Sequence, residues 1–351
     1  MHRVTAIFLG IITVIGLGVI LKLGQAVFLP LLVAFLLSFI FNPVIQLFTR
    51  IKIPRIISII LVILMFFGLF FLIGLFLFNS AQSFVDEYPK YLNILRDIIS
   101  DFTNRYLAQY NLGDNPLEGI NWSGALKSVV LTGSSAFLGF VGIFFIIILI
   151  LVFLFLETPV FSKKLSRAFP AHISKRIRIM LEHITRQISR YLGTKFLISF
   201  LTGGFTWLSL TIIGVDFPVM WGALAFFLNF IPNLGSITVV VVVVVQAAVQ
   251  FYPALGRTIA TAASMLTIQL VLGSLLDPKL QGERLNLSPV VILISLFFWG
   301  WLWGIAGAIV SVPIAALIKI ICENIPYLKP VSVIMGAGVR KRRKRLLNPG
   351  K

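Results

Sequence analysis

The sequence has few charged residues, few acidic residues among them, and a single cysteine. Only 12% of its 351 residues are charged, and 12 Asp or Glu stand against 30 Lys or Arg, which gives a net charge of +18. Because Cys322 is alone, neither an intramolecular disulfide nor a cysteine metal cluster can form. His172 and His183 lack an acidic or cysteine partner at a ligand spacing, so we expect no metal site and no cofactor.

Acidic residues are also missing from the centres of the apolar runs, since Glu157, Asp216, Asp277 and Glu323 all lie at segment ends. An ionisable residue deep in a membrane would be a functional signal, and none is evident. Intramembrane hydrolysis needs an activated nucleophile or paired aspartates. Ser236 has no His or Lys nearby in the sequence. We therefore expect that the protein is not an enzyme.

Long apolar runs are the main feature of the sequence, and 58% of its residues are hydrophobic. About 20 apolar residues cross a bilayer, and such runs occupy residues 4–21, 27–48, 56–78, 129–156, 196–213 and 258–276. Uninterrupted runs of this kind are not typical of outer-membrane barrels. The sequence thus predicts an all-α polytopic membrane protein with about six full transmembrane helices. Since the first run lacks a small-residue cleavage pattern, we expect it to be a retained helix.

Basic residues predict the orientation. If the amino terminus is cytoplasmic, six of the 30 Lys and Arg lie outside and the other 24 lie inside, as the positive-inside rule favours. The prediction is a multi-pass protein of the bacterial inner membrane with both termini in the cytoplasm. The basic run 340–345 is expected to anchor this topology and to contact anionic lipid headgroups rather than nucleic acid.

Two segments are predicted to lie outside the bilayer as amphipathic helices. Residues 79–128 carry six of the 12 acids, as suits an external position, and are expected to pack on a membrane surface or a neighbouring subunit. Residues 158–195 are rich in Lys and Arg. They fit either a basic helix along the inner membrane surface or a cytoplasmic extension of the next span.

An imperfect internal repeat follows, in which residues 218–236 resemble residues 289–307 with their prolines and Phe-Phe pairs in register. Residues 218–249 would form a straight helix of roughly 48 Å, longer than a hydrocarbon core of about 30 Å. Pro232 and its neighbours predict a break there, and Gly300, Gly304 and Gly307 predict one in the second copy. Each copy therefore fits a re-entrant helical hairpin.

The predicted loop positions give these hairpins opposite orientations. Two helix-plus-hairpin units would form an inverted repeat over residues 196–322, with the two tips meeting near the midplane. The remaining parts are three amino-terminal helices (1–78), a fourth (129–157) and a basic tail (323–351). If each hairpin half crossed the membrane, there would be about eight or more spans.

The two tips supply the candidate substrate-binding residues. Amide and hydroxyl groups at the first tip, with free N–H groups at the following helix start, favour a polar or anionic ligand. Indole faces at the second tip suit a small sugar-like molecule. The alternative is structural, because Trp favours bilayer interfaces and small residues favour tight helix packing. The predicted set is Asn229, Pro232, Asn233, Gly235, Ser236, Trp299, Gly300, Trp303, Gly304 and Gly307.

A second set concerns gating. Asp277 and Glu283 flank the loop DPKLQGE, which is interpreted either as a gate for the second hairpin or as a solvated turn. Gln246 and Gln269 are interpreted as interhelical hydrogen-bonding groups. The gating or loop residues are Asp277, Pro278, Gly282, Pro289 and Pro313.

Three stretches carry a family resemblance: NFIPNLGS, DPKLQGERLNLSPVV and LFFWGWLWGIAGAIVSVP. They resemble the carboxy-terminal signature of the autoinducer-2 exporter (AI-2E) family of PerM-like permeases, whose pattern differs at Asn233 and Ser236. The resemblance implies an inner-membrane transporter that forms a homo-oligomer, with a pentamer as one candidate. It also implies metabolite export in some members and sodium or proton antiport in others. The matching positions are Pro232, Gly235, Asp277, Pro278, Gly282, Pro289, Gly304, Gly307 and Pro313.

Three functions remain open from the sequence. The first is export of a small polar, autoinducer-2-like metabolite by alternating access of the two hairpins. The second is antiport of sodium or another cation against protons. The third is a membrane scaffold or regulator that transports nothing.

Overall fold

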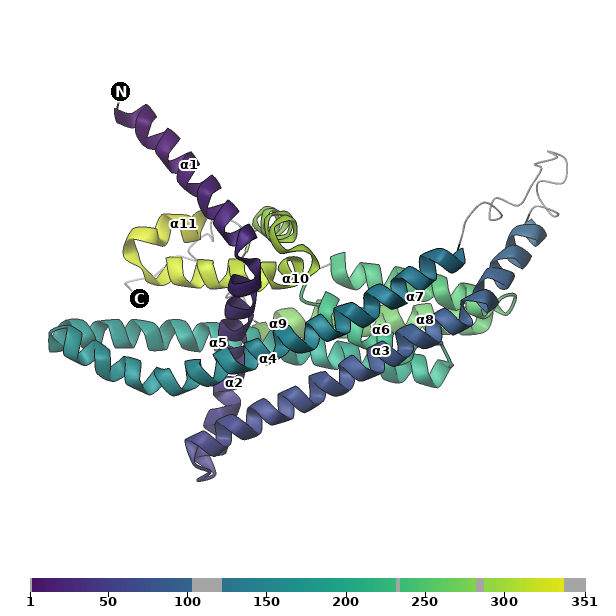
Figure 1. Ribbon diagram of the computed structural model, residues 1–351, viewed down its shortest axis with the longest axis horizontal. Coiled ribbons are helices and arrows are strands. Elements are labelled where there is room, and N and C mark those ends of the chain that lie inside the picture. Colours follow the sequence, from purple (N-terminus) through teal and green to yellow (C-terminus); the bar gives the residue numbers. More distant parts are fainter. Residues whose placement is uncertain (1, 103–121, 232–233, 282–286, 338–351) are drawn as a thin grey trace, which may run out of the picture.

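The computed structural model describes residues 2–102, 122–231, 234–281 and 287–337 (Figure 1). These residues are helical almost throughout and contain no β-strand, as the apolar runs predict. The longer elements are α1 (His2–Leu23), α2 (Gln25–Arg50), α3 (Arg55–Phe102), α4 (Trp122–Ala168), α5 (Ala171–Ile213) and α10 (Pro289–Asn324). The shorter ones are α6 (Pro218–Leu228), α7 (Leu234–Gln250), α8 (Leu255–Ile268), the π-helix η2 (Gln269–Leu276), α9 (Asp277–Gln281), the 3₁₀-helix η4 (Pro326–Leu328) and α11 (Lys329–Ile334).

Six helical stretches of the described chain are long and apolar enough to cross a membrane. They are Gln25–Arg50, Arg55–Ser80, Val141–Ala168, Ala171–Ile213, Leu255–Leu280 and Pro289–Asn324. The first five overlap the predicted runs from residue 27 onward. The first predicted run forms α1, and the sixth candidate span is instead α10, the second copy of the repeat.

Three helices, α3, α4 and α5, continue far beyond their apolar parts and give the molecule its elongated form (Figure 1). Helix α3 has 48 residues and continues without a break from its apolar half into the predicted external segment. Helix α5 has 43 residues, so residues 171–195 are continuous with the following span. This continuity matches the interpretation of the basic segment as an extension of the next span, because a separate surface helix would require a break near residue 195.

Aromatic packing joins α2, α3 and α4 to the first hairpin. Phe66 lies 4.4 Å from Phe41 and also 4.4 Å from Phe70, measured between ring centroids. Phe226 of α6 then contacts Phe70 at 6.0 Å and Phe196 of α5 at 5.5 Å. Such ring pairs favour a fixed mutual orientation, and they seat the first hairpin against the bundle.

Helices α5 and α6 approach each other closely because glycines face each other across the contact. A Cβ atom on Gly203 would lie 2.7 Å from the carbonyl oxygen of Gly222, and one on Gly222 would lie 2.8 Å from that of Gly203. Small residues allow this approach of backbones in membrane proteins. The first hairpin is therefore packed tightly on α5.

Candidate functional site

The first predicted break is present, since α6 ends at Leu228 and α7 begins at Leu234. Asn229 follows α6 and is 5% exposed, and its Nδ2 donates to Ser199 Oγ of α5 at 3.0 Å. Ser236 Oγ donates a long hydrogen bond of 3.5 Å to Asn229 Oδ1. A buried polar chain from Ser199 through Asn229 to Ser236 thus joins the hairpin turn to α5.

Gly235 allows this turn to close. A Cβ atom at residue 235 would overlap the carbonyl oxygen of Leu228 and lie 2.6 Å from its carbonyl carbon. No side chain fits between these backbones, so the position requires glycine for close approach. Pro232 and Asn233, the other predicted residues of this tip, lie outside the described residues.

A small, partly open cavity lies beside this turn and is lined by residues of α5, α6, α7, α8 and η2. The space open to the centre of a water molecule measures about 10 Å³, enough for roughly one water. Its lining residues are Thr202, Thr206, Ala225, Ser236, Val239, Val240, Met265, Ile268 and Gln269. The Thr206 hydroxyl is buried and makes no hydrogen bond within the described structure. The cavity therefore combines apolar walls with an unused polar group.

A π-helical turn borders the cavity at Gln269. Helix α8 ends at Ile268, and the chain continues as the π-helix η2. A Cβ atom at Gly273 would lie 2.5 Å from Gln269 Nε2, so Gly273 leaves room for this side chain. Such π-helical turns often occur at functional sites.

The second predicted break is also present. Within α10 the backbone leaves helical geometry at Trp303 and at Gly304, whose φ of 64° favours glycine. Ser295 Oγ donates to the carbonyl oxygen of Ser311 at 2.8 Å, whereas residues 16 apart in a straight helix would be separated by about 24 Å. The chain thus turns back on itself as a second helical hairpin.

Glycine closes the second hairpin as it closes the first. A Cβ atom at Gly307 would overlap the carbonyl oxygen of Trp299 and lie 2.8 Å from its carbonyl carbon. Trp299 and Leu228 are aligned positions of the internal repeat, and Gly307 lies one residue beyond the position aligned with Gly235, so the two hairpins close by a similar contact. Gly300, by contrast, is not crowded, because the nearest atom to a Cβ there is Ala308 Cβ at 3.8 Å.

The tryptophans of the second tip contact α1. Trp303 is 8% exposed, and its Nε1 donates to the carbonyl oxygen of Leu21 at 3.0 Å. Lys22 Nζ lies 4.2 Å from the ring centroid of Trp301. Trp299 packs against Trp303 with ring centroids 4.9 Å apart. The indole N–H of Trp303 therefore makes a hydrogen bond within the protein, as the structural alternative predicts.

The described residues form two groups and not one shared site. Asn229, Gly235 and Ser236 lie together at the first turn, whereas Trp299 to Gly307 lie together at the second. Within the described ranges no hydrogen bond, ring contact or core cluster joins the two turns. That the tips meet near the midplane stays a prediction.

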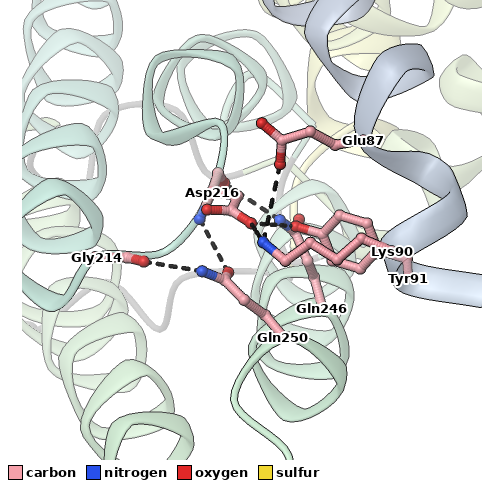
Figure 2. Close-up of polar contacts among 7 residues, drawn as sticks. All are labelled: Glu87, Lys90, Tyr91, Gly214, Asp216, Gln246 and Gln250. Carbon is pink, nitrogen blue, oxygen red and sulfur yellow. Dashed lines mark hydrogen bonds and ion pairs between the residues drawn. The ribbon is translucent and has the colours of Figure 1, made fainter. Parts of the chain in front are cut away.

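A polar network holds the opposite end of the first hairpin (Figure 2). Asp216 precedes α6, and its Oδ2 accepts from Tyr91 Oη of α3 at 2.6 Å and pairs with Lys90 Nζ at 3.3 Å. From α7, Gln250 Oε1 accepts from the Asp216 backbone N–H at 2.9 Å, and Gln246 Nε2 donates to the Asp216 carbonyl at 3.2 Å. We call these contacts the Asp216 clamp.

Burial of Tyr91 raises the pKa of its phenol well above the ordinary value, and the hydrogen bond to Asp216 raises it further. Tyr91 lies beyond the apolar part of α3. At neutral pH the phenol therefore keeps its proton and donates a hydrogen bond to the Asp216 carboxylate.

A second acidic residue is held by an ion pair. Lys195 Nζ of α5 lies 3.1 Å from Asp277 Oδ2, and the two side chains are 7% and 20% exposed. Asp277 begins α9 directly after η2, whereas Pro278 is exposed on this short helix. Asp277 is thus a paired, mostly buried group and not part of a solvated turn. Gly282 and Glu283, at the end of the loop, lie outside the described residues.

The two predicted prolines of α10 take different positions. Pro289 is exposed and starts the helix, where its fixed φ suits the first turn. Pro313 is buried in the second arm of the hairpin. Neither is among the residues that line the cavity.

Comparison of the sequence with known proteins shows its family. The family model described as AI-2E family transporter matches residues 5–327. The chain belongs to the AI-2E transporter family. The match includes the membrane helices, both hairpins and the Asp216 clamp, and it confirms the resemblance noted in the sequence.

Individual relatives of the AI-2E family support this assignment over nearly the whole length. The chain is 36% identical over 334 residues to a candidate transport protein of Borreliella burgdorferi, covering 95% of this chain and 91% of that protein. It is 30% identical to the candidate transport protein YhhT of Escherichia coli, with 89% of each chain covered. It is 29% identical to the AI-2 transport protein TqsA of Escherichia coli, with 87% of this chain and 88% of TqsA covered.

Sequence reasoning missed several residues of the first site. Ser199, Thr202 and Thr206 follow one another at three and four residues along an apolar part of α5, which places them on one helical face. This stripe of polar residues on one face of an apolar helix is the feature of the sequence that could have indicated the site. Lys90, Tyr91 and Lys195 gave no such signal, because their partners Asp216 and Asp277 are far away in the sequence.

Proposed function

We propose that this AI-2E family protein is a secondary transporter that exports a small polar solute, with its binding site at the turn of the first hairpin. The observation that carries the proposal is the polar chain Ser199, Asn229 and Ser236 beside a cavity with the unpartnered Thr206 hydroxyl. Burying a polar group without a hydrogen-bond partner costs free energy in a membrane protein. A transported polar solute would supply the missing hydrogen bonds.

The lining also supports a class of solute. No charged side chain is among the residues that line the cavity in the described chain. A charged solute would lose its hydration without a compensating partner, so the proposal is for an uncharged solute. Autoinducer-2 is a candidate, because the relative TqsA is named as an AI-2 transport protein.

The small volume of the cavity supports a moving hairpin. Space for about one water cannot hold a solute of several carbon atoms. Binding therefore requires the first hairpin to move relative to α5 or α8. We propose that the two hairpins form an inverted repeat and expose one site alternately to each side, as in other transporters with broken helices.

The proposal places the protein in the bacterial inner membrane with both termini in the cytoplasm. The excess of Lys and Arg in the predicted inner segments supports this orientation. The exposed apolar side chains of α1, such as Phe8, Ile12 and Ile15, suit contact with lipid or with further copies in a homo-oligomer.

Cation/proton antiport is a second candidate, and the Lys195–Asp277 pair favours it. Lys195 is 5% exposed, so both members of this pair lie largely inside the protein. A carboxylate that is released from such a pair could bind a cation or a proton in its place. In this case the coupling chemistry would lie near α9 and not at the first turn.

Counterflow into proteoliposomes tests the main proposal. Vesicles that contain the purified protein and unlabelled autoinducer-2 should accumulate labelled autoinducer-2 from outside, while empty vesicles should not. Ser236→Ala should reduce this accumulation several-fold, because it removes a hydroxyl from the cavity. Thr238→Ala is the matched control, since Thr238 is exposed on α7 and bonds only its own helix.

The same vesicles separate the alternatives. Equal counterflow by the wild type and Ser236→Ala would contradict the proposed site. Sodium-dependent proton flux without counterflow would support antiport, and Asp277→Asn should then abolish it. A protein that remains folded and shows neither flux would support the scaffold interpretation.

A further inference from the structure

The end of α3 beyond the membrane has a structural role that membrane crossing does not explain. Residues 81–102 continue α3 past its apolar part. On this extension, Lys90 and Tyr91 reach the turn between α5 and α6, 126 and 125 residues further along the chain. The ring of Tyr91 also packs against the core cluster of the first hairpin, which includes Trp221 and Val243.

The turn that they hold has an unfavourable backbone. Gly214 has a φ of 84°, and Phe217 has a φ of 58°, although Phe217 is not glycine. The left-handed region is disfavoured for residues with a bulky side chain. Such a conformation persists only where its surroundings hold it. The Asp216 clamp and the hairpin core provide these surroundings, and Gln250 Nε2 also donates to the Gly214 carbonyl oxygen at 2.9 Å.

The clamp also fixes both arms of the first hairpin at one point. Asp216 adjoins α6, while Gln246 and Gln250 belong to α7, so a single residue is bonded to the two arms and to α3. Figure 2 shows Lys90 and Tyr91 reaching Asp216 from α3, and Gln246 and Gln250 reaching the same residue from α7. The arms then lead inward to Ala225 and Ser236, which line the cavity.

We propose that residues 87–91 of α3 form a latch that keeps the first hairpin closed. Release of Asp216 from Tyr91 and Lys90 lets the strained turn at residues 214–217 relax and lets α6 and α7 move away from α5. Glu87 lies 4.0 Å from Lys90 Nζ and provides an alternative partner for the lysine when Asp216 leaves. The cavity opens toward the latch side.

Thiol accessibility tests the latch directly. Val240→Cys in a Cys322→Ser background places the only thiol at the cavity wall, outside the clamp. Adding Tyr91→Phe removes the 2.6 Å hydrogen bond and keeps the ring. We expect an impermeant maleimide to label Val240→Cys about tenfold faster, the ratio expected for the loss of one charge-assisted hydrogen bond. The increase should occur only from the side of the vesicle where residues 87–91 lie.

Two further variants exclude a general loosening of the protein. Ser83→Ala removes a hydroxyl from the same part of α3, where it bonds only Asn79 of its own helix, and should leave the labelling rate unchanged. Asp216→Ala should speed labelling, and Tyr91→Phe should then have a smaller effect than in the wild type, because the two side chains share the 2.6 Å hydrogen bond. Equal rates with and without Tyr91→Phe, or an undiminished Tyr91→Phe effect in Asp216→Ala, would overturn the latch.

This inference goes beyond the proposed function, and the two can fail separately. Labelling is measured without any solute, so a faster rate in Tyr91→Phe supports the latch even where no autoinducer-2 counterflow is seen. Counterflow with unchanged labelling would instead support transport and contradict the latch.

Discussion

The close contact within the second hairpin predicts a large difference between two Gly→Ala substitutions. At Gly307 a new Cβ would overlap the Trp299 carbonyl oxygen and lie 3.0 Å from Trp303 Cβ. The main obstacle is backbone, which cannot rotate away as a side chain would. We therefore expect Gly307→Ala to cost about 3 kcal/mol, the upper end of the usual range for overpacking.

Gly300→Ala is the matched control in the same hairpin. Its Cβ would meet Ala308 Cβ at 3.8 Å, an ordinary van der Waals distance. Replacing a helical Gly by Ala reduces the entropy lost on folding and contributes roughly 0.5–1 kcal/mol. Gly300→Ala should therefore leave the stability unchanged or raise it slightly.

The protein contains its own reporter for this comparison. Cys322 is the single cysteine, and it is 6% exposed in α10. A dye that fluoresces on reaction with a thiol should report its exposure as the detergent-solubilised protein is heated. We expect the midpoint for Gly307→Ala to fall by about 6–12 °C, at roughly 2–4 °C per kcal/mol. Midpoints that agree between Gly307→Ala and Gly300→Ala would refute the hairpin contact.

Three other predictions use the same assay. Lys195→Ala should lower the midpoint more than Lys195→Ala combined with Asp277→Asn, because the single change removes the lysine that neutralises a mostly buried carboxylate. Equal losses would contradict the pairing. Trp303→Phe should cost about 1 kcal/mol, since it removes the hydrogen bond to α1 and keeps the ring packing; an unchanged midpoint would argue against this bond. The pKa of Tyr91 is raised in the folded protein. Its hydrogen bond therefore stabilises the folded state fully below the unfolded pKa of about 10. This stabilisation is lost only as the pH rises through the folded pKa. The midpoint difference between wild type and Tyr91→Phe should therefore stay constant from about pH 6 to 9. A difference that shrinks in this range would contradict the raised pKa of Tyr91.

The helices and their breaks could be predicted because they depend on local sequence. Apolar length located five of the six candidate spans. The break after Leu228 followed from the excess length of one run, and the break at Gly304 followed from its glycines. Both helical hairpins could thus be predicted from the sequence. Their re-entrant placement in the membrane stays a prediction.

The lengths of α3 and α5 could not be predicted in the same way. Hydropathy changes sharply within both helices, near residues 80 and 195, but a change of solvent does not end a helix when the backbone hydrogen bonds continue. The predicted boundary between membrane and external segment is therefore a change of surface and not of secondary structure. This continuity is what carries Tyr91 to Asp216.

The polar contacts of the site depend on pairs that are distant in the sequence. Asn229 was predicted as a site residue from its place beside a break, but its partner Ser199 is 30 residues away. Lys195 and Asp277 are separated by 82 residues. Such pairs follow from how helices pack together, and a single sequence contains no direct signal for them.

Access to the two hairpin turns from each side of the membrane tests the central claim most directly. Single cysteines at Ser236 and Ala306 in a Cys322→Ser background place a thiol at each turn. Ala306 is exposed and replaces the crowded Gly307 as the reporter. An impermeant thiol reagent would be applied to each side of oriented vesicles. Alternating access predicts that each cysteine is labelled from both sides. Labelling from one side only, or from neither, would contradict it and favour a static membrane scaffold.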